Sequence, residues 1–445
     1  MMTGIFKAYD IRGIIPDELS EKTAYLIGRA VGVFLARSPL VVSRDMRTTG
    51  PLIAGAVIDG ITDSGRDVVD AGLLSTPANY FTIGHYDYPG GVQVTASHNP
   101  KEYNGMKISR EQAQPVSYDT GIGEIERMVA EDSFPPAARK GKVGQRDVTA
   151  DYTEHVLSFA RDVKPLKVVI DAGNGMAGKM LPPILAQLPG EFVKLYFDLD
   201  GTFPNHEANP LKDQNLADLR KAVVDAHAHV GVAFDGDADR VGFIDETGAI
   251  IPNDLMGALL ARQVLSHERG ATVIYDPRSS WVVKEEIVAG GGVPQVERVG
   301  HSYMKATMRR LRAPFGLELS GHFYFRDNYC ADSGVIGMMT LLSLLSREDA
   351  SLSELLKPLR RYSSTGEINF EVTDKDAKIA EIADAFSDGE QSRVDGITVE
   401  YADWWFNVRK SNTEPLLRLT LEGKTPELRD AGYARVTAHL GEPEP

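Results

Sequence analysis

A serine lies where a short apolar stretch gives way to a turn. Residues 90–94 alternate apolar and polar side chains, as a half-buried strand does, and Asn99-Pro100 ends the regular structure just after Ser97. A serine at a strand end can act as a nucleophile if other groups activate its hydroxyl and compensate charge. An ordinary turn is the alternative, because serine, asparagine and proline are common turn residues. Ser97 is therefore a candidate nucleophile that needs support from the rest of the chain.

Three carboxylates occupy alternate positions in a second stretch, Asp235-Gly236-Asp237-Ala238-Asp239-Arg240. Carboxylates at this spacing, with a glycine that allows close backbone approach, can converge on one hard divalent cation such as Mg²⁺. An EF-hand calcium loop does not fit this stretch, because Arg240 occupies the place of the required glycine and residues 241–244 have the pattern of a strand. A solvated hairpin turn is the alternative, but clustered negative charge is self-repulsive without a compensating ion. The sequence therefore favours a metal site.

Two further loops have the composition of ligand-binding segments. Residues 316–322 place a carboxylate, a hydroxyl and an imidazole where alternating side chains can hydrogen-bond sugar hydroxyls. Residues 409–415 set an arginine beside hydroxyl, amide and backbone donors, which is phosphate-binding chemistry. Either loop alone is more often a solvated loop. Their combination with the serine and the carboxylates favours a site.

A glycine-rich stretch gives a competing interpretation. Residues 173–178, Gly-Asn-Gly-Met-Ala-Gly, follow a predicted strand and match a dinucleotide-binding fingerprint, with Asp198 at about the expected distance. That match is the best sequence support for an NAD-dependent oxidoreductase. The pattern is short, and a chain with 42 glycines produces chance matches, so a tight strand-to-helix turn is enough to explain it.

The elements that must position these groups recur as strand, loop and helix. Apolar runs at 39–45, 166–171 and 271–276 each end in aspartate and precede a turn and helical sequence. The first run follows a helix that is capped near Ser20. Because the spacing is too large and uneven for a solenoid, the pattern predicts three similar α/β domains with largely buried sheets.

The end of the chain predicts a smaller α+β domain. Strands with one apolar face are expected at 368–372 and 416–421, and helices at 376–386 and 427–440. Composition shifts at 134–142, 245–248 and 362–366 predict the joins. The predicted domains are 1–147 with the serine loop, 148–249 with the acidic loop, 250–364 with the sugar loop, and 365–445 with the phosphate loop.

The whole-chain numbers exclude several classes of protein. A chain of 445 residues is long enough for three or four domains. A formal net charge of -15 argues against nucleic acid or an anionic membrane as the main partner. Without a basic leader or an apolar run long enough to span a bilayer, the expected location is the cytoplasm. The single cysteine, Cys330, fits a reducing compartment and is expected to be a small apolar core residue.

Four ordered motifs resemble those of the α-D-phosphohexomutase superfamily, namely residues 95–100, 235–240, 318–322 and 409–415. The chain looks most like the phosphomannomutase/phosphoglucomutase branch, and the likeness extends to residues 7–13, 103–107 and 300–302. The resemblance implies an α/β fold of three similar mixed-sheet domains and a smaller C-terminal α+β domain around a central cleft. These expectations agree with the units inferred from the pattern.

The resemblance also implies a phosphoserine mechanism. Ser97 would carry a phosphoryl group, and one Mg²⁺ per chain would lie between that phosphate and Asp235, Asp237 and Asp239. The phosphoryl group would pass to a phosphorylated hexose and return from a hexose 1,6-bisphosphate. Hexose 1-phosphate and hexose 6-phosphate would thereby interconvert, with glucose 1,6-bisphosphate or an equivalent as activator.

The remaining site residues implied by the resemblance form two groups. Proton transfer and charge stabilisation are expected from Lys107, His98, Arg12, Arg240 and His301. Substrate binding is expected from Lys7, Tyr9, Arg278, Glu318, Ser320, His322, Arg409, Ser411, Asn412 and Thr413. Closure of the last domain would exclude water from the phosphoserine.

Four positions bear on which sugar is used. Arg278 stands where the family commonly has lysine, and Leu317 stands where a glycine is usual, so both leave substrate preference open. Thr95 and Asn412 differ from the residues of glucosamine-specific relatives and favour sugars with a 2-hydroxyl. A phosphoglucosamine mutase, a phosphoserine-dependent sugar phosphatase and a non-catalytic sugar-phosphate binder remain alternatives. Neither the choice between mannose and glucose nor that between monomer and dimer follows from the sequence.

Overall fold

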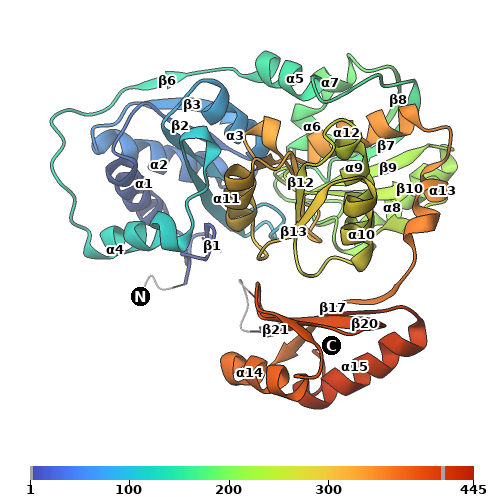
Figure 1. Cartoon of the computed structure of the whole chain (residues 1–445). Helices are drawn as coiled ribbons and strands as arrows, with labels where there is room; N and C mark the ends of the chain where they lie inside the picture. Colours follow the sequence, from blue (N-terminus) through green and yellow to red (C-terminus); the bar gives the residue numbers. More distant parts are fainter. Residues whose placement is uncertain (1–3, 412–415, 445) are drawn as a thin grey trace. The chain divides into compact units, whose positions relative to one another are not determined.

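The computed structural model describes residues 4–411 and 416–444, and the chain divides into two compact units. The first unit contains the chain up to residue 251 together with residues 320–353, and the second contains residues 252–319 and 354 onward. Figure 1 shows that each unit combines sheets with covering helices. Across the described ranges, no helix is both long enough and apolar enough to cross a bilayer.

The first sheet of the first unit carries the serine loop and is mixed. Its strands lie in the order β1 (Ile11–Ile14), β5 (Tyr103–Arg110), β4 (Gly90–Val94), β2 (Leu40–Arg44), β3 (Val68–Leu73) and β6 (Val143–Gln145). β2 pairs in parallel with β3 and β4, whereas β5 runs antiparallel to β4 and β1. The helices of this part are α1 (Glu21–Leu35), α2 (Gly50–Asp63), α3 (Thr76–His85) and α4 (Gly123–Glu131).

The sequence patterns explain these elements. The side chains of β2 from Leu40 to Val42 are completely buried, as expected for a parallel strand that is covered on both faces. Ser20 caps α1 by accepting a hydrogen bond from the backbone N–H of Thr23, as predicted. Apolar residues of α1, including Ile27 and Val31, join those of α2 in one core.

The second sheet of the first unit carries the acidic loop. Its strands lie in the order β11 (Ile250–Ile251), β10 (Val241–Asp245), β9 (Val230–Phe234), β7 (Leu166–Asp171) and β8 (Gly190–Leu195). β7 pairs in parallel with β8 and β9, and β9, β10 and β11 run antiparallel in turn. The helices of this part are α5 (Thr149–Leu157), α6 (Ala177–Met180), α7 (Pro182–Leu185) and α8 (Ala217–Asp225). Residues 235–240 therefore form the turn of the β9–β10 hairpin.

Residues 320–353 add a hairpin and a helix to the first unit. Strand β15 (Phe323–Phe325) pairs antiparallel with β16 (Ala331–Asp332), and α12 (Gly334–Arg347) follows. Cys330, just before β16, is buried, as predicted. A short helix, α13 (Leu352–Leu356), comes next in the chain.

The second unit contains a parallel arrangement and a separate antiparallel sheet. β12 (Thr272–Tyr275) pairs in parallel with β13 (Val293–Val296) and β14 (Phe315–Leu317). The helices of this part are α9 (Asn253–Leu265), α10 (Trp281–Ala289) and α11 (His301–Leu311). The antiparallel sheet has the order β17 (Ser363–Glu371), β21 (Leu416–Gly423), β20 (Trp404–Lys410), β19 (Ile397–Glu400) and β18 (Glu390–Ser392). Helices α14 (Lys375–Ala385) and α15 (Pro426–Leu440) lie on one side of it and share its apolar core (Figure 1).

Most predicted elements are present, with three differences in detail. The three runs that end in aspartate are the strands β2, β7 and β12, each followed by a helix, as predicted. The strand predicted at 416–421 to have one apolar face is β21, which is buried along nearly its whole length because it lies between β17 and β20. The second sheet extends through β11 to Ile251, beyond the predicted domain end at 249. β17 begins at Ser363, before the predicted domain start at 365, and the domain ranges otherwise stay predictions.

Candidate active site

Ser97 lies in the turn that follows β4, with only 1% of its surface exposed. Its Oγ donates a hydrogen bond to Asp235 Oδ2 at 2.7 Å and lies 3.2 Å from His98 Nδ1. Its backbone φ is +49°, an uncommon conformation for a residue other than glycine. Such conformations persist only where the surroundings hold them, and they are found at active sites. The structure therefore brings the serine loop and the acidic loop together, although they are far apart in sequence.

The three aspartates of the acidic loop are buried and close to one another. Asp235, Asp237 and Asp239 each offer a carboxylate oxygen, and these oxygens all lie within 4.8 Å of one another. Lys107, on β5, donates to Asp237 Oδ2 at 2.7 Å and also to Asp239 Oδ2. Thr76, at the start of α3, donates its hydroxyl to the same Asp237 Oδ2 at 2.5 Å. One lysine thus neutralises part of a dense cluster of negative charge.

The cluster changes the pKa values of its members. Burial, followed by repulsion from Asp239 and Asp237, raises the pKa of Asp235 well above its usual range. Burial opposes the charge of Lys107, but the attraction of Asp237 and Asp239 outweighs it and raises the pKa of Lys107 well above normal. Burial likewise disfavours ionised Asp239, yet Lys107 and His322 outweigh it and lower the pKa of Asp239 well below its usual range. In this arrangement Lys107 is a cation.

The donor set fits a hard divalent cation. Mg²⁺ prefers carboxylate oxygens, and this loop offers three of them in a buried position. Within residues 4–411 and 416–444, Asp237 Oδ1 has no hydrogen-bond partner although it is buried. A buried oxygen without a hydrogen-bond partner destabilises the fold unless an ion or a water molecule binds it. The residues present can therefore hold a metal ion.

Arginine and histidine side chains surround the serine and the carboxylates. Arg12 pairs with Asp10 and donates to the side chain of Asn99, in the serine loop. Arg240 Nε donates to His322 Nε2 at 3.2 Å, and His322 Nδ1 lies 2.8 Å from Ser320 Oγ. Burial, with the charges of Arg240 and Arg12, lowers the pKa of His98 well below its usual range, so its imidazole is neutral.

Close backbone packing joins the two loops. A Cβ atom on Gly236 of the acidic loop would lie 2.5 Å from the carbonyl oxygen of Ser97, closer than atoms can approach. A Cβ on Gly175 would lie 2.8 Å from the carbonyl oxygen of Gly236, and the same oxygen accepts a hydrogen bond from the N–H of Met176. The glycine-rich stretch that matches a dinucleotide fingerprint therefore packs against the acidic loop.

The second unit holds the predicted sugar-binding and phosphate-binding arginines and carboxylates. Arg409 on β20 is 2% exposed, and its Nη2 donates to Glu367 Oε2 at 2.8 Å. Glu367 on β17 also contacts Arg278 at 3.3 Å and Arg418 at 3.0 Å. Burial opposes ionised Glu367, but Arg278, Arg409 and Arg418 outweigh it and lower its pKa to about 2. Glu367 could not be predicted as a site residue from the sequence, because a lone glutamate on a strand carries no local signal of three arginine partners.

The other predicted residues of this unit are held by neighbouring backbone and side chains. Arg278 donates to both carboxylate oxygens of Asp276, and Glu318 Oε1 accepts the backbone N–H of Gly300, next to His301. The N–H of Ser411 donates to Leu416 O at 2.9 Å, whereas the predicted phosphate ligands Asn412 and Thr413 lie outside the described residues.

Leu317, within the sugar loop, is a position that left substrate preference open. In the structure Leu317 is fully buried at the end of β14, and a Cβ on Gly257 of α9 would lie 2.6 Å from its Cδ1. Its side chain fills space between the strand and the helix, so its role is packing.

The predicted residues thus form one set in each unit. In the first unit the structure brings together Arg12, Ser97, His98, Lys107, Asp235, Asp237, Asp239, Arg240, Ser320 and His322. Lys7 and Tyr9 also belong to this unit, and Lys7 joins the turn through its backbone N–H and Asp10 O. The set of the second unit is Arg278, His301, Glu318, Arg409 and Ser411.

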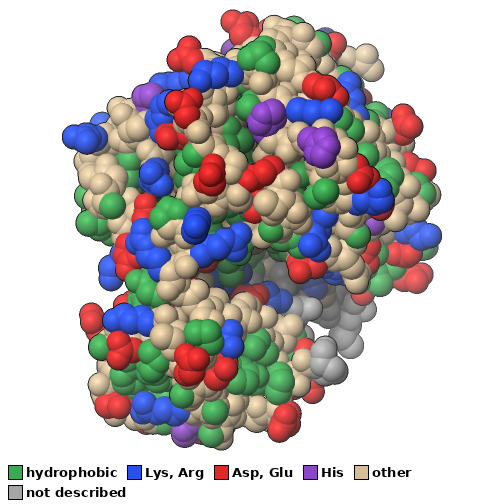
Figure 2. Space-filling view, turned by 90° about the vertical axis from the view of Figure 1, so that its right-hand side faces the viewer, with side chains coloured by type: hydrophobic (Ala, Val, Ile, Leu, Met, Phe, Trp, Pro, Cys, Tyr) green, Lys and Arg blue, Asp and Glu red, His purple; other side chains and the backbone are tan. Residues whose placement is uncertain are grey.

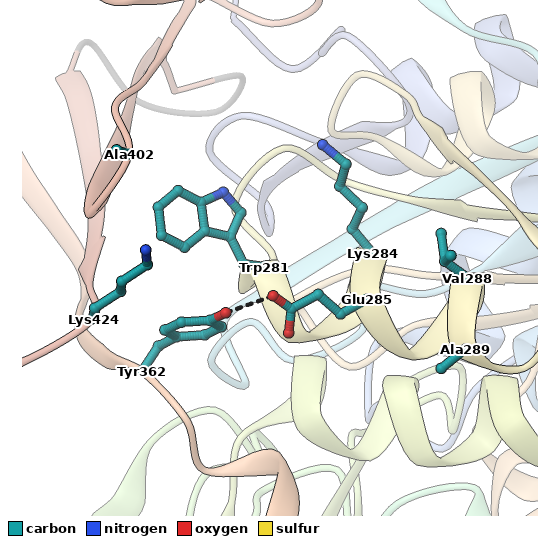
Figure 3. A pocket seen from close by; sticks show the side chains of 8 residues that line it. All are labelled: Trp281, Lys284, Glu285, Val288, Ala289, Tyr362, Ala402 and Lys424. Atoms are coloured by element: carbon teal, nitrogen blue, oxygen red, sulfur yellow. Dashed lines mark hydrogen bonds between the residues drawn. The ribbon is translucent and has the colours of Figure 1, made fainter.

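A pocket of about 540 Å³ lies elsewhere in the second unit (Figure 3). Its walls are α10, with Trp281 and Lys284, and residues Tyr362, Ala402 and Lys424. The Tyr362 hydroxyl donates to Glu285, as the dashed line in Figure 3 marks. No predicted site residue lines this pocket, and Trp281 Nε1 donates to Glu400 while Lys424 pairs with Asp403, so we assign it no ligand. On the face drawn in Figure 2, lysine and arginine side chains are interspersed with aspartate and glutamate.

A buried hydroxyl beside carboxylates that can hold a divalent cation, in a chain of repeated α/β units, is suited to phosphoryl transfer. Family models for phosphoglucomutase/phosphomannomutase match almost the whole chain. The alpha/beta/alpha domains I, II and III match residues 3–136, 150–248 and 252–362, and the C-terminal domain matches residues 367–438. The chain belongs to the phosphoglucomutase/phosphomannomutase family.

Individual relatives agree with this assignment. Phosphohexose mutases of Xanthomonas campestris pv. campestris are 42% identical to this chain, over 94% of each sequence. A phosphomannomutase of Salmonella typhimurium is 40% identical, again over 94% of each. A crystal structure of a family protein from Burkholderia thailandensis has a TM-score of 0.91 and 35% identity, covering 99% of this chain and 98% of that one. The protein is accordingly an enzyme, an isomerase of the phosphohexomutase class.

Proposed function

We propose that this enzyme interconverts hexose 1-phosphates and hexose 6-phosphates of mannose, glucose or both, through a phosphoserine at Ser97 and a hexose 1,6-bisphosphate. The observation that carries the proposal is the buried Ser97 Oγ, 2.7 Å from Asp235 in the same cluster that holds Lys107. A serine hydroxyl needs such neighbours to act as a nucleophile. The cytoplasm stays our expectation for the location, and phosphorylated hexoses for the partners.

Two half-reactions follow from this chemistry. In the first, the bond between the phosphoserine oxygen and phosphorus breaks while a sugar hydroxyl forms a new bond to phosphorus; the sugar hydroxyl gives up its proton and the Ser97 oxygen takes one up. In the second, the sugar oxygen that leaves phosphorus takes up a proton, while Ser97 Oγ takes the other phosphoryl group of the bisphosphate and loses its own proton. Asp235 Oδ2 already accepts that proton in a hydrogen bond, and His98 Nδ1 lies 3.2 Å away. These two groups are therefore placed to receive it.

Lys107 contributes positive charge, and its role in proton transfer stays a proposal. Its ammonium lies between Asp237 and Asp239 with only 8% of its side chain exposed. A cation fixed in a poorly solvated place stabilises negative charge on a transferring phosphoryl group without reorganising. Arg12 and Arg240 add charge on the other sides of the loop, and we propose the same electrostatic role for them and for His301.

We propose that Asp235, Asp237 and Asp239 hold one Mg²⁺ per chain, with an oxygen on Ser97 as a further ligand. When bound, the ion would offset the negative charge of the transferring phosphoryl group. Support comes from the three convergent carboxylates and from the oxygen of Asp237 that has no partner among the described residues. Thr76 holds the opposite oxygen of Asp237 and so fixes the rotation of that carboxylate.

Substrate binding is proposed for the second set of residues and for the sugar loop. Glu318, Ser320 and His322 would bind sugar hydroxyls. Arg409 and Ser411, with Asn412 and Thr413, would hold the phosphate that is not reacting, and Arg278 would supply charge beside them. Lys7 and Tyr9 are proposed as further substrate-binding residues. Glu367 holds the Arg409 guanidinium by one nitrogen and thereby orients it.

The preference for sugars with a 2-hydroxyl also remains a proposal. Thr95 Oγ1 donates to Asp45 at 2.6 Å and accepts the N–H of Ser97 at 2.9 Å, so both hydrogen-bonding directions are used inside the loop. Thr95 therefore bears on the shape of the loop and not on direct contact with a sugar. Phosphoglucosamine mutase activity stays the alternative that an assay must separate.

Coupled assays with mannose 1-phosphate, glucose 1-phosphate and glucosamine 1-phosphate, in Mg²⁺ and a trace of glucose 1,6-bisphosphate, test the proposal. We expect turnover with mannose or glucose 1-phosphate, and intact mass should show one phosphate on the wild type and none on Ser97→Ala. Ser97→Ala should lose nearly all turnover, because its hydroxyl carries the transferred group. Ser109→Ala, at another buried serine of the same sheet, is the control.

Three results would contradict the proposal in different ways. Full activity in Ser97→Ala rejects the phosphoserine. Phosphate release without isomerisation indicates the phosphatase instead. Turnover confined to glucosamine 1-phosphate assigns the enzyme to the alternative substrate.

A further inference from the structure

Arg47 is a buried cation whose side chain donates hydrogen bonds to Asp45 and to backbone carbonyls of residues 97–103. It lies in the turn after β2, and its side chain has no exposed surface. Its Nη1 donates to Pro100 O at 2.7 Å and Tyr103 O at 2.9 Å. Its Nη2 donates to Ser97 O at 2.8 Å and Asn99 O at 2.6 Å. One guanidinium therefore donates hydrogen bonds to four carbonyl oxygens within seven consecutive residues.

Every donor of this guanidinium is used. An arginine has five N–H groups in a planar fork. Four of them bond the carbonyls of residues 97–103, and the fifth, on Nε, donates to Asp45 Oδ2 at 3.3 Å. The charge of Arg47 is balanced by Asp45, whose side chain is also fully enclosed. Because the pair is neutral overall, its contribution is geometry and not net charge.

Asp45 extends the same network to the other side of the serine. Its carboxylate accepts the N–H of Arg47 at 3.0 Å and the hydroxyl of Thr95 at 2.6 Å. Thr95 Oγ1 in turn accepts the N–H of Ser97 at 2.9 Å. The N–H of Ser97 is thus held through Thr95, and its carbonyl is held directly by Arg47. Fixing both groups fixes the two backbone dihedrals of Ser97.

The backbone of Ser97 needs such support. Its φ of +49° is disfavoured for any residue with a Cβ atom. The direction of the Ser97 side chain follows from that backbone, and its Oγ reaches Asp235 in this conformation. Apolar side chains would fill a core position with less desolvation cost than a buried ion pair. The cation is therefore better explained by the shape that it imposes on the loop.

We propose that Arg47 is a positioning residue for phosphoryl transfer. By binding the carbonyls of residues 97–103, it holds Ser97 Oγ within hydrogen-bonding distance of Asp235 in the acidic loop. This role rests on the proposed function, since it concerns the group that carries the phosphoryl. Arg47 touches no reacting atom; it acts through the backbone of the loop. Lysine cannot replace it, because an ammonium has three donors and no fork.

Arg47→Lys tests the role while it keeps the charge. We expect kcat to fall about 100-fold, as for a misplaced reactive group, while KM for the hexose 1-phosphate changes less than about threefold. The single-turnover rate at which glucose 1,6-bisphosphate phosphorylates Ser97 should fall in parallel, read by intact mass. Arg66→Lys is the matched control, since Arg66 donates to one backbone carbonyl, Gly32 O, elsewhere in the same domain.

Thr95→Val gives a second measurement that is independent of whether Arg47→Lys folds. It keeps the volume and removes only the hydroxyl that joins Ser97 to Asp45. We expect kcat to fall about tenfold with KM unchanged, since one of the two links to Ser97 is lost. Circular dichroism and the thermal midpoint of each variant report whether the fold is intact.

The outcomes separate this proposal from the one that it rests on. Wild-type kcat and phosphorylation rate in Thr95→Val and in any folded Arg47→Lys overturn the positioning role and leave the phosphoserine mechanism standing. A rise in KM at constant kcat also overturns it, as does a loss of kcat that is matched by the loss of folded protein. If wild-type enzyme turns over hexose phosphates with no phosphate on Ser97, the mechanism fails and the role of Arg47 fails with it.

Discussion

Glu367 is the carboxylate on which three arginines of the second unit converge. Its oxygens lie 2.8 Å from Arg409, 3.0 Å from Arg418 and 3.3 Å from Arg278, and 21% of its side chain is exposed. These guanidinium groups outweigh the cost of burial and lower the pKa of Glu367 from 4.5 to about 2. Such a change corresponds to about 3 kcal/mol of extra stability for the folded form with ionised Glu367.

The sign of the pH effect follows from that lowered pKa. Since the folded state holds the proton more weakly than the unfolded state, the stabilisation is fully present above pH 4.5. It is lost as the pH falls toward about 2, where the folded carboxylate takes up its proton. Glu367→Gln removes the charge at every pH. At pH 7 the variant should therefore lose about 2–3 kcal/mol of local stability, and its stability should depend less on pH in the acid range.

Native-state hydrogen exchange measures this change where it occurs. A chain with several domains does not unfold in two states, whereas exchange reports the opening free energy of single amides. We would compare amides of β17 and β21 in the wild type, in Glu367→Gln and in Glu371→Gln, whose side chain is exposed on the same strand. Equal opening free energies in the wild type and Glu367→Gln at pH 7, or parallel pH profiles from pH 5 to pH 2, would refute the reasoning.

Three further predictions concern the proposed metal and phosphate sites. Thorough chelation, or Asp237→Asn, should reduce phosphoryl transfer by orders of magnitude in the coupled assay, and undiminished turnover after chelation rejects the metal. Thr76→Val should weaken Mg²⁺ binding about 10- to 100-fold in a calorimetric titration, because Thr76 orients Asp237; wild-type affinity would show that the hydrogen bond has no such role. Arg409→Ala should weaken hexose phosphate binding by about 2–4 kcal/mol, with partial rescue by lysine. Arg418→Ala, which shares Glu367, is the control, and equal losses in the two variants would place the clamp elsewhere.

Much of the fold could be predicted because its signals are local. Apolar runs that end in aspartate mark β2, β7 and β12, and Ser20 marks the start of α1. Strand β10 was predictable as well, since residues 241–244 have the pattern of a strand. Resemblance to a family, and not spacing, placed the serine loop beside the acidic loop.

The parts that could not be predicted depend on contacts between distant residues. Thr76, Arg47 and Glu367 have the types of ordinary turn or strand residues, and each acquires its partners only through folding. The packing of Leu317 against Gly257 of α9 was not predictable for the same reason, because the two residues are far apart in sequence. A hydrogen-bond network leaves no period in the sequence, so periodicity does not reveal it.

Three chain segments, at Gly175, Gly236 and Ser97, touch through bare backbone. No side chain separates these segments from one another. A methyl group added at Gly175 would therefore displace Gly236, and that displacement would reach Ser97. Gly175→Ala would therefore act on catalysis from a position that touches neither the hydroxyl nor any carboxylate. Two glycines of the motif that matches a nucleotide-binding fingerprint serve close approach of backbone, Gly175 to Gly236 and Gly178 to Phe197, whereas Gly173 has a positive φ of +52°.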